Sequence, residues 1–302
     1  MTERWDRVAT PDGRSLELLV QGDPDGTLLI FHHGSPGSAA PFAPFDRAAA
    51  ERRIALAFLS RAGFGDSSRQ EGRRVLEAAA DAAAIADHLG RETFLTTGWS
   101  GGGPHALACA ALLPDRVLAC ATIAGVAPYD AEGLDWTAGM GEDNQVEYPL
   151  AARDPDASLE WLRPRAEAMA KIRPDEIVAE LRSIISEVDA AQVTGAFGES
   201  LAASFRGAFR HGPWGWFDDD QAFVHDWGFD LASIRVPVSV WQGEQDLMVP
   251  FAHGEWLVRH VPTARARLHP EHGHLSLGVG AFGAILDDLL ETSGTTVSRI
   301  DV

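Results

Sequence analysis

Short apolar runs of strand length alternate with helix-like segments through the first part of this 302-residue chain. The expected strands are Leu16–Val20, Thr27–His32, Ile54–Leu59, Thr93–Thr97 and Val117–Ile123, and the expected helices are Val75–Leu89 and Gly103–Leu113. Strands that alternate with helices in this way favour a mostly parallel sheet with helices on both faces. The pattern therefore predicts an α/β fold.

The alternation stops at Pro128 and resumes after Phe229. The stretch between them has no buried strand, holds five of the nine tryptophans, and has helix-like patterns at Leu159–Ile172 and Pro174–Glu187. Two more expected strands (Val236–Trp241, Ala264–Leu268) and two more expected helices (Phe251–His260, Leu277–Leu290) follow. We therefore expect an α/β core of residues 1–127 and 230–302, interrupted by a helical cap of residues 128–229.

The segment Gly98-Trp99-Ser100-Gly101-Gly102 joins an expected strand to an expected helix. Glycines on both sides of a serine allow a sharp strand-to-helix turn in which larger side chains would clash. Such a turn holds the hydroxyl above the sheet, at the positive end of the helix. We predict that Ser100 is a catalytic nucleophile; the alternative is a glycine-rich turn without chemistry.

A second glycine-containing segment, His33-Gly34-Ser35-Pro36-Gly37, follows the expected strand Thr27–His32. A hydrolase that forms a tetrahedral intermediate needs backbone N–H groups directed at the developing oxyanion. One N–H group would come from Gly101, the residue after the serine, and the other from Ser35. The two residues are therefore predicted to form an oxyanion hole, unless the segment is an ordinary loop.

An acid and a base follow the last two expected strands. Asp246 comes shortly after Val236–Trp241, and His274 comes after Ala264–Leu268. The carboxyl ends of parallel strands are where the active sites of open α/β sheets lie. We predict a triad in which His274 is the base for Ser100 and Asp246 orients His274.

Other polar residues near these motifs have lesser expected roles. Asp130 is an alternative to Asp246 as the acid. His105 is expected to be a packed helix residue rather than a second base. His32 precedes the oxyanion loop and is a candidate to hold it through a hydrogen bond, the alternative being no such role.

His269, Glu271 and His272 lie close to His274 in the sequence and suggest a metal site. No second group of ligands with metal-binding spacing accompanies them, so we predict neither a metal nor a cofactor. Cys109 and Cys120 have apolar surroundings and are expected to be core residues without a disulfide.

The chain resembles the α/β-hydrolase superfamily from about Leu16 to Leu290. The resembling pieces are the oxyanion segment, the turn around Ser100, Arg61-Ala62-Gly63-Phe64-Gly65-Asp66-Ser67, Gly243–Asp246 and Gly273-His274. Such families often have D-x-P-G-x-G-x-S after the fourth strand, and here Ser60 and Ala62 replace its Asp and Pro. The resemblance implies a cap after the sixth strand and the triad order Ser, Asp, His.

A serine at position 100 argues against epoxide hydrolases and haloalkane dehalogenases, which need a carboxylate there. The leading hypothesis is a serine hydrolase that cleaves a small, largely apolar carboxylic ester or lactone through an acyl-enzyme on Ser100. A proline-iminopeptidase-like amide hydrolase is the alternative; Asp218, Asp219 and Asp220 would then hold a free amino terminus, unless they form a solvated loop. Cofactor-free perhydrolysis, carbon–carbon bond hydrolysis and non-catalytic small-molecule binding also stay open.

The charge of the chain bears on its partners. Lys and Arg number 25 against 44 Asp and Glu, which gives a formal net charge of −19. Such a surface repels nucleic acid and anionic membranes, so we expect a small-molecule substrate and neither of those partners. No apolar signal segment or membrane span is seen, which favours a cytoplasmic protein. The oligomeric state stays open.

Overall fold

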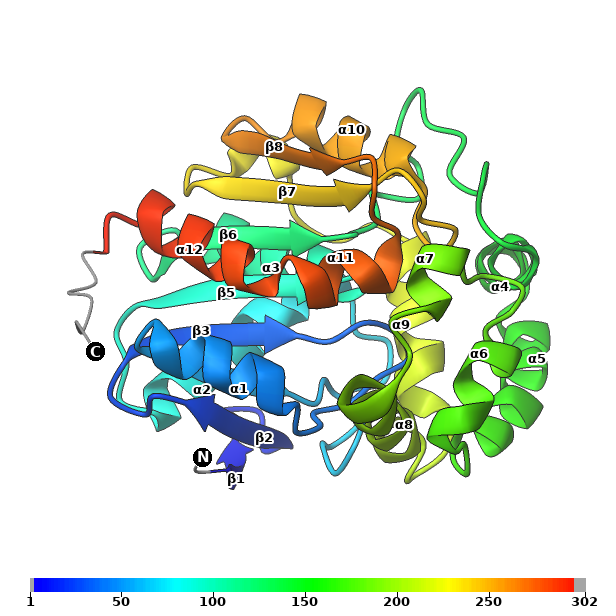
Figure 1. The fold of residues 1–302 in the computed structure, drawn as a ribbon, viewed down its shortest axis with the longest axis horizontal. Helices are drawn as coiled ribbons and strands as arrows, with labels where there is room; N and C mark the ends of the chain where they lie inside the picture. The colour runs from blue at the N-terminus through cyan, green and yellow to red at the C-terminus, as the bar shows by residue number, and fades with distance from the viewer. Residues whose placement is uncertain (1–2, 296–302) are drawn as a thin grey trace.

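The computed structural model describes residues 3–295 and contains a central sheet of eight strands (Figure 1). From one edge to the other the strands are β1 (Arg4–Ala9), β2 (Ser15–Gly22), β4 (Ile54–Leu59), β3 (Thr27–His32), β5 (Phe94–Trp99), β6 (Val117–Ile123), β7 (Val238–Gly243) and β8 (Ala264–His269). β2 pairs antiparallel with β1 and β4, and every other neighbouring pair is parallel. The predicted α/β fold with a mostly parallel sheet is confirmed.

Helices cover both faces of the sheet. One face carries α1 (Ala43–Glu51), α11 (His274–Gly280) and α12 (Phe282–Thr292), which lie in front of the strands in Figure 1. The other face carries α2 (Ala78–His88), α3 (Gly102–Leu112) and α10 (Phe251–His260), with the short 3-10 turns η1 (Val75–Glu77) and η3 (Leu231–Ser233). No helix within residues 3–295 is long and apolar enough to cross a membrane.

The central strands are mostly apolar, and both of their faces are buried. In β3, Leu28 and Ile30 pack into the cluster under α2 and α3, whereas Leu29 and Phe31 pack into the cluster under α1 and α12. Successive side chains of a strand point to opposite faces, so one run of residues supplies both cores. This burial holds the carboxyl ends of the parallel strands in one row, where the candidate site lies.

Between β6 and β7 the chain leaves the sheet and forms a set of helices. They are α4 (Glu142–Arg153), α5 (Pro155–Met169), η2 (Pro174–Glu176), α6 (Ile177–Glu180), α7 (Glu187–Ala190), α8 (Gly195–Ala208) and α9 (Trp214–Val224). They gather beyond the carboxyl ends of the parallel strands, at the right of Figure 1. We refer to residues 128–229 as the insertion.

Two helices expected from the sequence are interrupted. The expected helix Pro174–Glu187 is divided into η2, α6 and α7. Within this range, the backbone carbonyl of Ser183 accepts a hydrogen bond from the backbone N–H of Glu142 (3.2 Å). The Ser183 hydroxyl donates to the carboxylate of Asp143 (2.5 Å). These bonds to α4 replace continuation of the helix. The expected helix Leu277–Leu290 is two helices, α11 and α12, that meet at Ala281.

Candidate active site

The turn from β5 to α3 is sharp and places Ser100 in an unusual backbone conformation. Ser100 has a φ of 56°, in the left-handed region, and its N–H donates to the carbonyl of Ile123 (2.8 Å). A Cβ atom on Gly98 would lie 1.9 Å from the carbonyl oxygen of Gly102, and a Cβ on Gly102 would lie 2.1 Å from that of His32. Only glycine fits at these two positions, as the sequence predicts.

His274 and Asp246 lie together, as the sequence predicts for a base and its orienting acid. Nδ1 of His274 donates to Oδ2 of Asp246 at 2.8 Å. The other carboxylate oxygen of Asp246 accepts from the backbone N–H groups of Met248 and Val249, both at 2.8 Å. Because the carboxylate accepts a hydrogen bond from Nδ1–H, Nε2 of the imidazole is left free to take a proton from another group.

The environment of His274 acts on its pKa in two opposing ways. Burial disfavours the charged imidazolium and lowers the pKa, while the charge of Asp246 and its hydrogen bond raise it. The carboxylate outweighs the burial, and the pKa lies above the ordinary value of 6.5. In the described part of the chain, Ser100 Oγ makes no hydrogen bond to His274; such contacts are often long without a ligand.

Ser35 and Gly101, the predicted oxyanion residues, lie in contact. A Cβ built on Gly101 would be 3.0 Å from the Cβ of Ser35. Neither backbone N–H donates a hydrogen bond to any group among residues 3–295. The Ser35 hydroxyl is also buried without a partner in this range. The two N–H groups are therefore free for a ligand beside Ser100.

Arg61 and His33 hold the segment that leads to Ser35. The guanidinium of Arg61 donates to the carbonyl oxygens of His33 and Gly34, and its backbone N–H donates to Nε2 of His33 (3.1 Å). Nδ1 of His33 donates in turn to the carbonyl of Gly34 (2.6 Å). Burial and the nearby charge of Arg61 hold the pKa of His33 well below its usual range, so this imidazole is neutral.

This arrangement corrects the role expected for His32. The His32 imidazole is fully buried, its nearest polar contact is Sγ of Cys109 (3.7 Å), and its Nδ1 has no partner among the described residues. Burial and the charge of Arg61 lower its pKa to about 3. The histidine that binds the loop is the next one, His33.

Asp219 on α9 balances the charge of Arg61. It forms ion pairs with Arg61 (2.5 Å) and Arg73 (2.6 Å), and all three side chains are buried. Burial by itself would raise the pKa of Asp219, but the charges of the two arginines hold it below its ordinary value. The Asp219–Arg61–Arg73 cluster thus joins the insertion to the oxyanion segment.

Neither expected role of the three consecutive aspartates is correct. Asp218, Asp219 and Asp220 are buried on α9 rather than in a solvated loop, and none of them lines the cavity beside Ser100. Asp218 pairs with Arg69 at 2.8 Å. Burial and the neighbouring Glu147 raise the pKa of Asp220 well above its usual range. Asp218 and Asp219 thus bind arginines of the protein itself.

His105 and Asp130 do not line the cavity beside Ser100. His105 is buried in α3 and its Nδ1 donates to the carbonyl of Gly101 (2.8 Å), which agrees with a packed helix residue. Asp130 is exposed and lines a separate hollow with Trp227 and Trp256. Asp246, not Asp130, is the carboxylate that binds the imidazole of His274.

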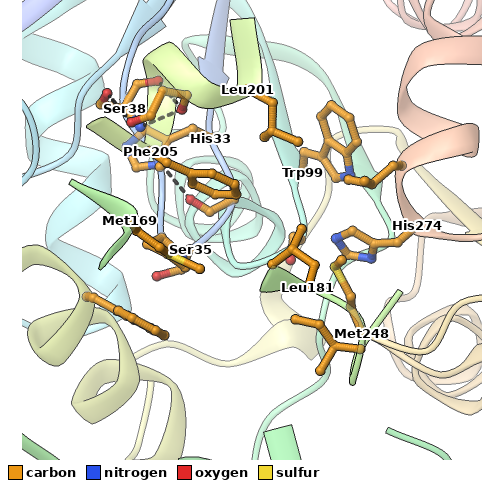
Figure 2. A pocket seen from close by; sticks show the side chains of 18 of the residues that line it. His33, Ser35, Ser38, Trp99, Met169, Leu181, Leu201, Phe205, Met248 and His274 are labelled. Atoms are coloured by element: carbon orange, nitrogen blue, oxygen red, sulfur yellow. Dashed lines mark hydrogen bonds between the residues drawn. The ribbon is translucent and has the colours of Figure 1, made fainter. Parts of the chain in front are cut away.

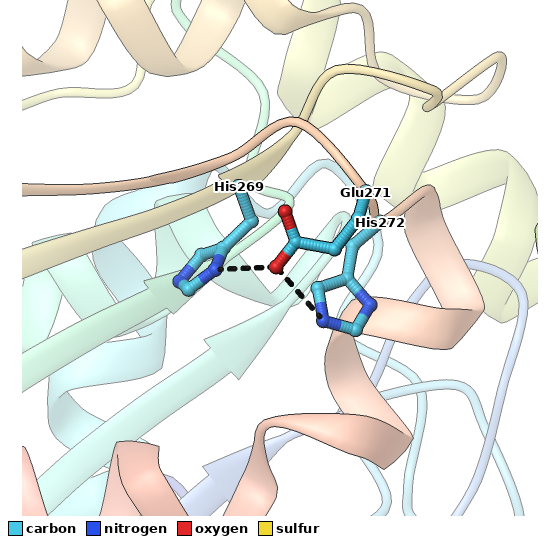
Figure 3. Close-up of side chains that lie close together, drawn as sticks. All are labelled: His269, Glu271 and His272. Carbon is cyan, nitrogen blue, oxygen red and sulfur yellow. Dashed lines mark ion pairs between the residues drawn. The ribbon is translucent and has the colours of Figure 1, made fainter.

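His269, Glu271 and His272 come together at the surface just before His274 (Figure 3). Oε1 of Glu271 lies 3.6 Å from Nδ1 of His269 and 3.9 Å from Nε2 of His272. Glu271 is exposed and none of the three lines the cavity. The two histidines therefore point away from the region of Ser100, and absence of a metal stays a prediction.

Ser100, Ser35 and His274 face one cavity of about 200 Å³ between the sheet and the insertion. Figure 2 shows Ser35 and His274 on the wall of this cavity. Most of its wall is apolar and includes Phe42, Trp99, Met169, Leu181, Leu201, Phe205 and Met248. The charged side chains on the wall are Asp143, Glu147, Glu180 and Arg165. The cavity therefore suits an uncharged, apolar ligand better than an anionic one.

The comparisons with known proteins agree with this architecture. A family model described as the alpha/beta hydrolase fold matches residues 27–281. Since the match spans most of the chain, the protein belongs to the α/β-hydrolase family.

Solved structures of the same fold match almost the whole chain. A hydrolase from Pseudomonas aeruginosa has a TM-score of 0.67 and 20% identity, covering 97% of this chain and 99% of that one. An esterase from a Rhodococcus species has a TM-score of 0.62 and 19% identity, with 98% and 99% covered. The enol-lactonase from Burkholderia xenovorans has a TM-score of 0.62 and 17% identity, with 95% and 99% covered. At such identities the likeness shows a shared fold, so the reaction must be argued from the site.

Sequence reasoning missed Asp189, a fully buried aspartate of α7 in the insertion. Its carboxylate accepts hydrogen bonds from the backbone N–H groups of His274, Leu275 and Ser276. Its partners are 85 to 87 residues away along the chain, so no local pattern identifies it. The sequence motif that begins at Arg61 also gave no indication of the role of this arginine.

The buried ion pairs of Asp219 generate a stability prediction. Asp219→Asn leaves two buried guanidinium groups facing a neutral amide, which should lower the free energy of unfolding by ~3–5 kcal/mol in urea titrations. The control is Asp287→Asn, which breaks a two-bond pair with Arg52 at a side chain that is 60% exposed. That change should cost less than ~1 kcal/mol. Equal losses in the two variants would contradict the assignment.

Proposed function

We propose that this protein is a serine hydrolase that cleaves a small, largely apolar carboxylic ester or lactone through an acyl-enzyme on Ser100. The observation that carries the proposal is the left-handed Ser100 at the β5–α3 turn, facing the same cavity as an imidazole whose Nδ1 is bound to a carboxylate. A serine needs such a base to become a nucleophile near neutral pH.

In the proposed reaction, Ser100 Oγ attacks the carbonyl carbon of the substrate while its proton passes to Nε2 of His274. The carbonyl oxygen becomes an oxyanion that accepts hydrogen bonds from the N–H groups of Ser35 and Gly101. His274 then gives the proton to the leaving alkoxide, which departs and leaves an ester on Ser100. Water, deprotonated by His274, attacks that ester and releases the acid and the free serine.

The substrate class follows from the walls of the cavity. Aromatic and aliphatic side chains of the core and of the insertion surround the space beside Ser100. Three acidic residues and one arginine also line this space. We infer that the insertion of residues 128–229 acts as a cap that excludes water and favours uncharged acyl or alkoxy groups. The net charge of −19 also disfavours the approach of anions.

The amide-hydrolase alternative needs cap carboxylates that hold a free amino terminus, and the aspartates suggested for that role are buried and do not line the cavity. Glu147 lines the cavity, but it already accepts a hydrogen bond from Nε1 of Trp216 (2.7 Å). Burial raises the pKa of Glu147 to about 7, which weakens it as an anchor for an ammonium group. A panel of p-nitrophenyl esters and aminoacyl amides separates the two hypotheses.

Replacing the nucleophile should abolish turnover. Ser100→Ala should lower kcat for p-nitrophenyl esters by about 10³–10⁶-fold and prevent labelling by a fluorophosphonate probe, because it removes the hydroxyl that forms the acyl-enzyme. The control Ser233→Ala changes an exposed serine away from the cavity and should keep both properties. A folded Ser100→Ala protein with more than about a tenth of normal activity would refute the mechanism. An unlabelled but ligand-binding wild type would instead favour a non-catalytic role.

The pH profile should report the raised pKa of His274. The base must be neutral to accept a proton, so kcat/KM should fall as the pH drops, with a midpoint above 6.5. Asp246→Asn removes the charge that raises this pKa, so the midpoint should move to lower pH, and kcat should drop by up to about 10⁴-fold. Steady-state kinetics from pH 5 to 9 test both effects. An unchanged midpoint would mean that Asp246 does not act on the base.

Matched ester pairs test the inferred substrate class. A neutral ester should be hydrolysed with a higher kcat/KM than an ester of the same size with a carboxylate on its acyl group, because the anion meets three acids and an apolar wall. The ratio should shrink at high salt, since ions screen the long-range part of the repulsion. Preference for the anionic ester would overturn the inference about the cavity while leaving the nucleophile intact.

A further inference from the structure

The base His274 is the first residue of a helix whose N-terminal end is bound by the insertion. α11 begins at His274, and its N-cap residue is Gly273, which has no side chain to accept hydrogen bonds. Oδ2 of Asp189 accepts from the N–H of His274 (2.8 Å), and Oδ1 accepts from those of Leu275 (2.9 Å) and Ser276 (2.8 Å). These N–H groups have no acceptor within the helix itself.

The position of Asp189 is defined closely by its surroundings. It is fully buried on α7, and the hydroxyl of Ser186 donates to its Oδ2 (2.9 Å). A Cβ atom on Gly273 would lie 2.4 Å from the same oxygen, so the chain before His274 approaches the carboxylate as closely as a residue without a side chain allows. Figure 1 shows α7 of the insertion beside the beginning of α11.

We propose that Asp189 is a positioning residue for His274: by holding three successive backbone N–H groups, it sets the direction in which the imidazole faces Ser100. The inference rests on the proposed function, in which His274 is the base. It assigns to the insertion a part in assembling the catalytic geometry, in addition to covering the cavity. A residue that holds a catalytic group typically changes activity by about 10–100-fold when it is replaced.

Two carboxylates face His274 from different elements. Asp246, after β7, binds its Nδ1, and Asp189, on α7, binds its backbone; the ring of Trp99 on β5 lies 6.3 Å away and is uncharged. The negative charges of both aspartates raise the pKa of His274, with that of Asp246 the larger. Loss of the Asp189 charge should therefore lower this pKa.

The test variant is Asp189→Asn, which has nearly the same shape. Its amide oxygen still accepts from two N–H groups, while its NH₂ group replaces an acceptor and faces donors. We expect kcat per fluorophosphonate-titrated site to fall by about 10–100-fold with KM within about threefold, and the acid midpoint of kcat/KM to move to lower pH. The control Ser186→Ala removes one hydrogen bond of Asp189 and leaves the three to α11. It should keep kcat and the midpoint.

The outcomes separate this inference from the proposed function. If Asp189→Asn keeps kcat per labelled site and the midpoint, and only the free energy of unfolding falls, Asp189 is merely structural and the inference is wrong. If wild-type protein is not labelled at Ser100, the proposed function itself fails. Should Asp189→Asn not fold, Gly273→Ala replaces it, because the added Cβ pushes the carboxylate away from α11. An unchanged kcat in Gly273→Ala would then refute the inference.

Discussion

The left-handed conformation of Ser100 is the constraint on which the candidate site depends. Such a conformation costs a non-glycine residue about 1–3 kcal/mol, and it persists only where the surroundings determine it. Here the N–H of Ser100 is bound to Ile123 on β6, and its carbonyl accepts from Gly103 in α3. Hydrogen bonds to the central sheet and to α3 therefore maintain this strained backbone conformation. The conformation directs the Ser100 hydroxyl toward the cavity.

The insertion touches the site through buried carboxylates at two places. Asp219 binds Arg61, which binds the backbone just before Ser35, and Asp189 binds the backbone at His274. Loops that carry function are usually held by the rigid scaffold of their own domain. In this molecule part of that support comes from helices outside the sheet, which explains why these acids are buried despite their charge.

The sequence was sufficient for features that depend on neighbouring residues. The strands at Ile54–Leu59 and Val117–Ile123 have the predicted bounds because continuous apolar runs report burial on both faces. The β5–α3 turn was predictable because its glycines are adjacent to Ser100. The roles of Asp189 and of the aspartates in α9 were not predictable, because their partners lie far away along the chain. A carboxylate with no partner nearby in the sequence is expected to be exposed to solvent. Strand β1 was not predicted, because most of its side chains are exposed.

The Asp219–Arg61–Arg73 cluster couples substitutions in the insertion to substitutions in the α/β core. All three side chains are buried, so loss of Asp219 alone would leave two guanidinium groups without a counter-charge, and a neutral residue there would require compensating changes at the arginines. Recombination has the same limit: a chimera whose new insertion lacked an acid at the position of Asp219 would keep two unmatched arginines in its core. Exchanging the insertion of this protein for one without such an acid thus means replacing residues 61 and 73 together with the helices.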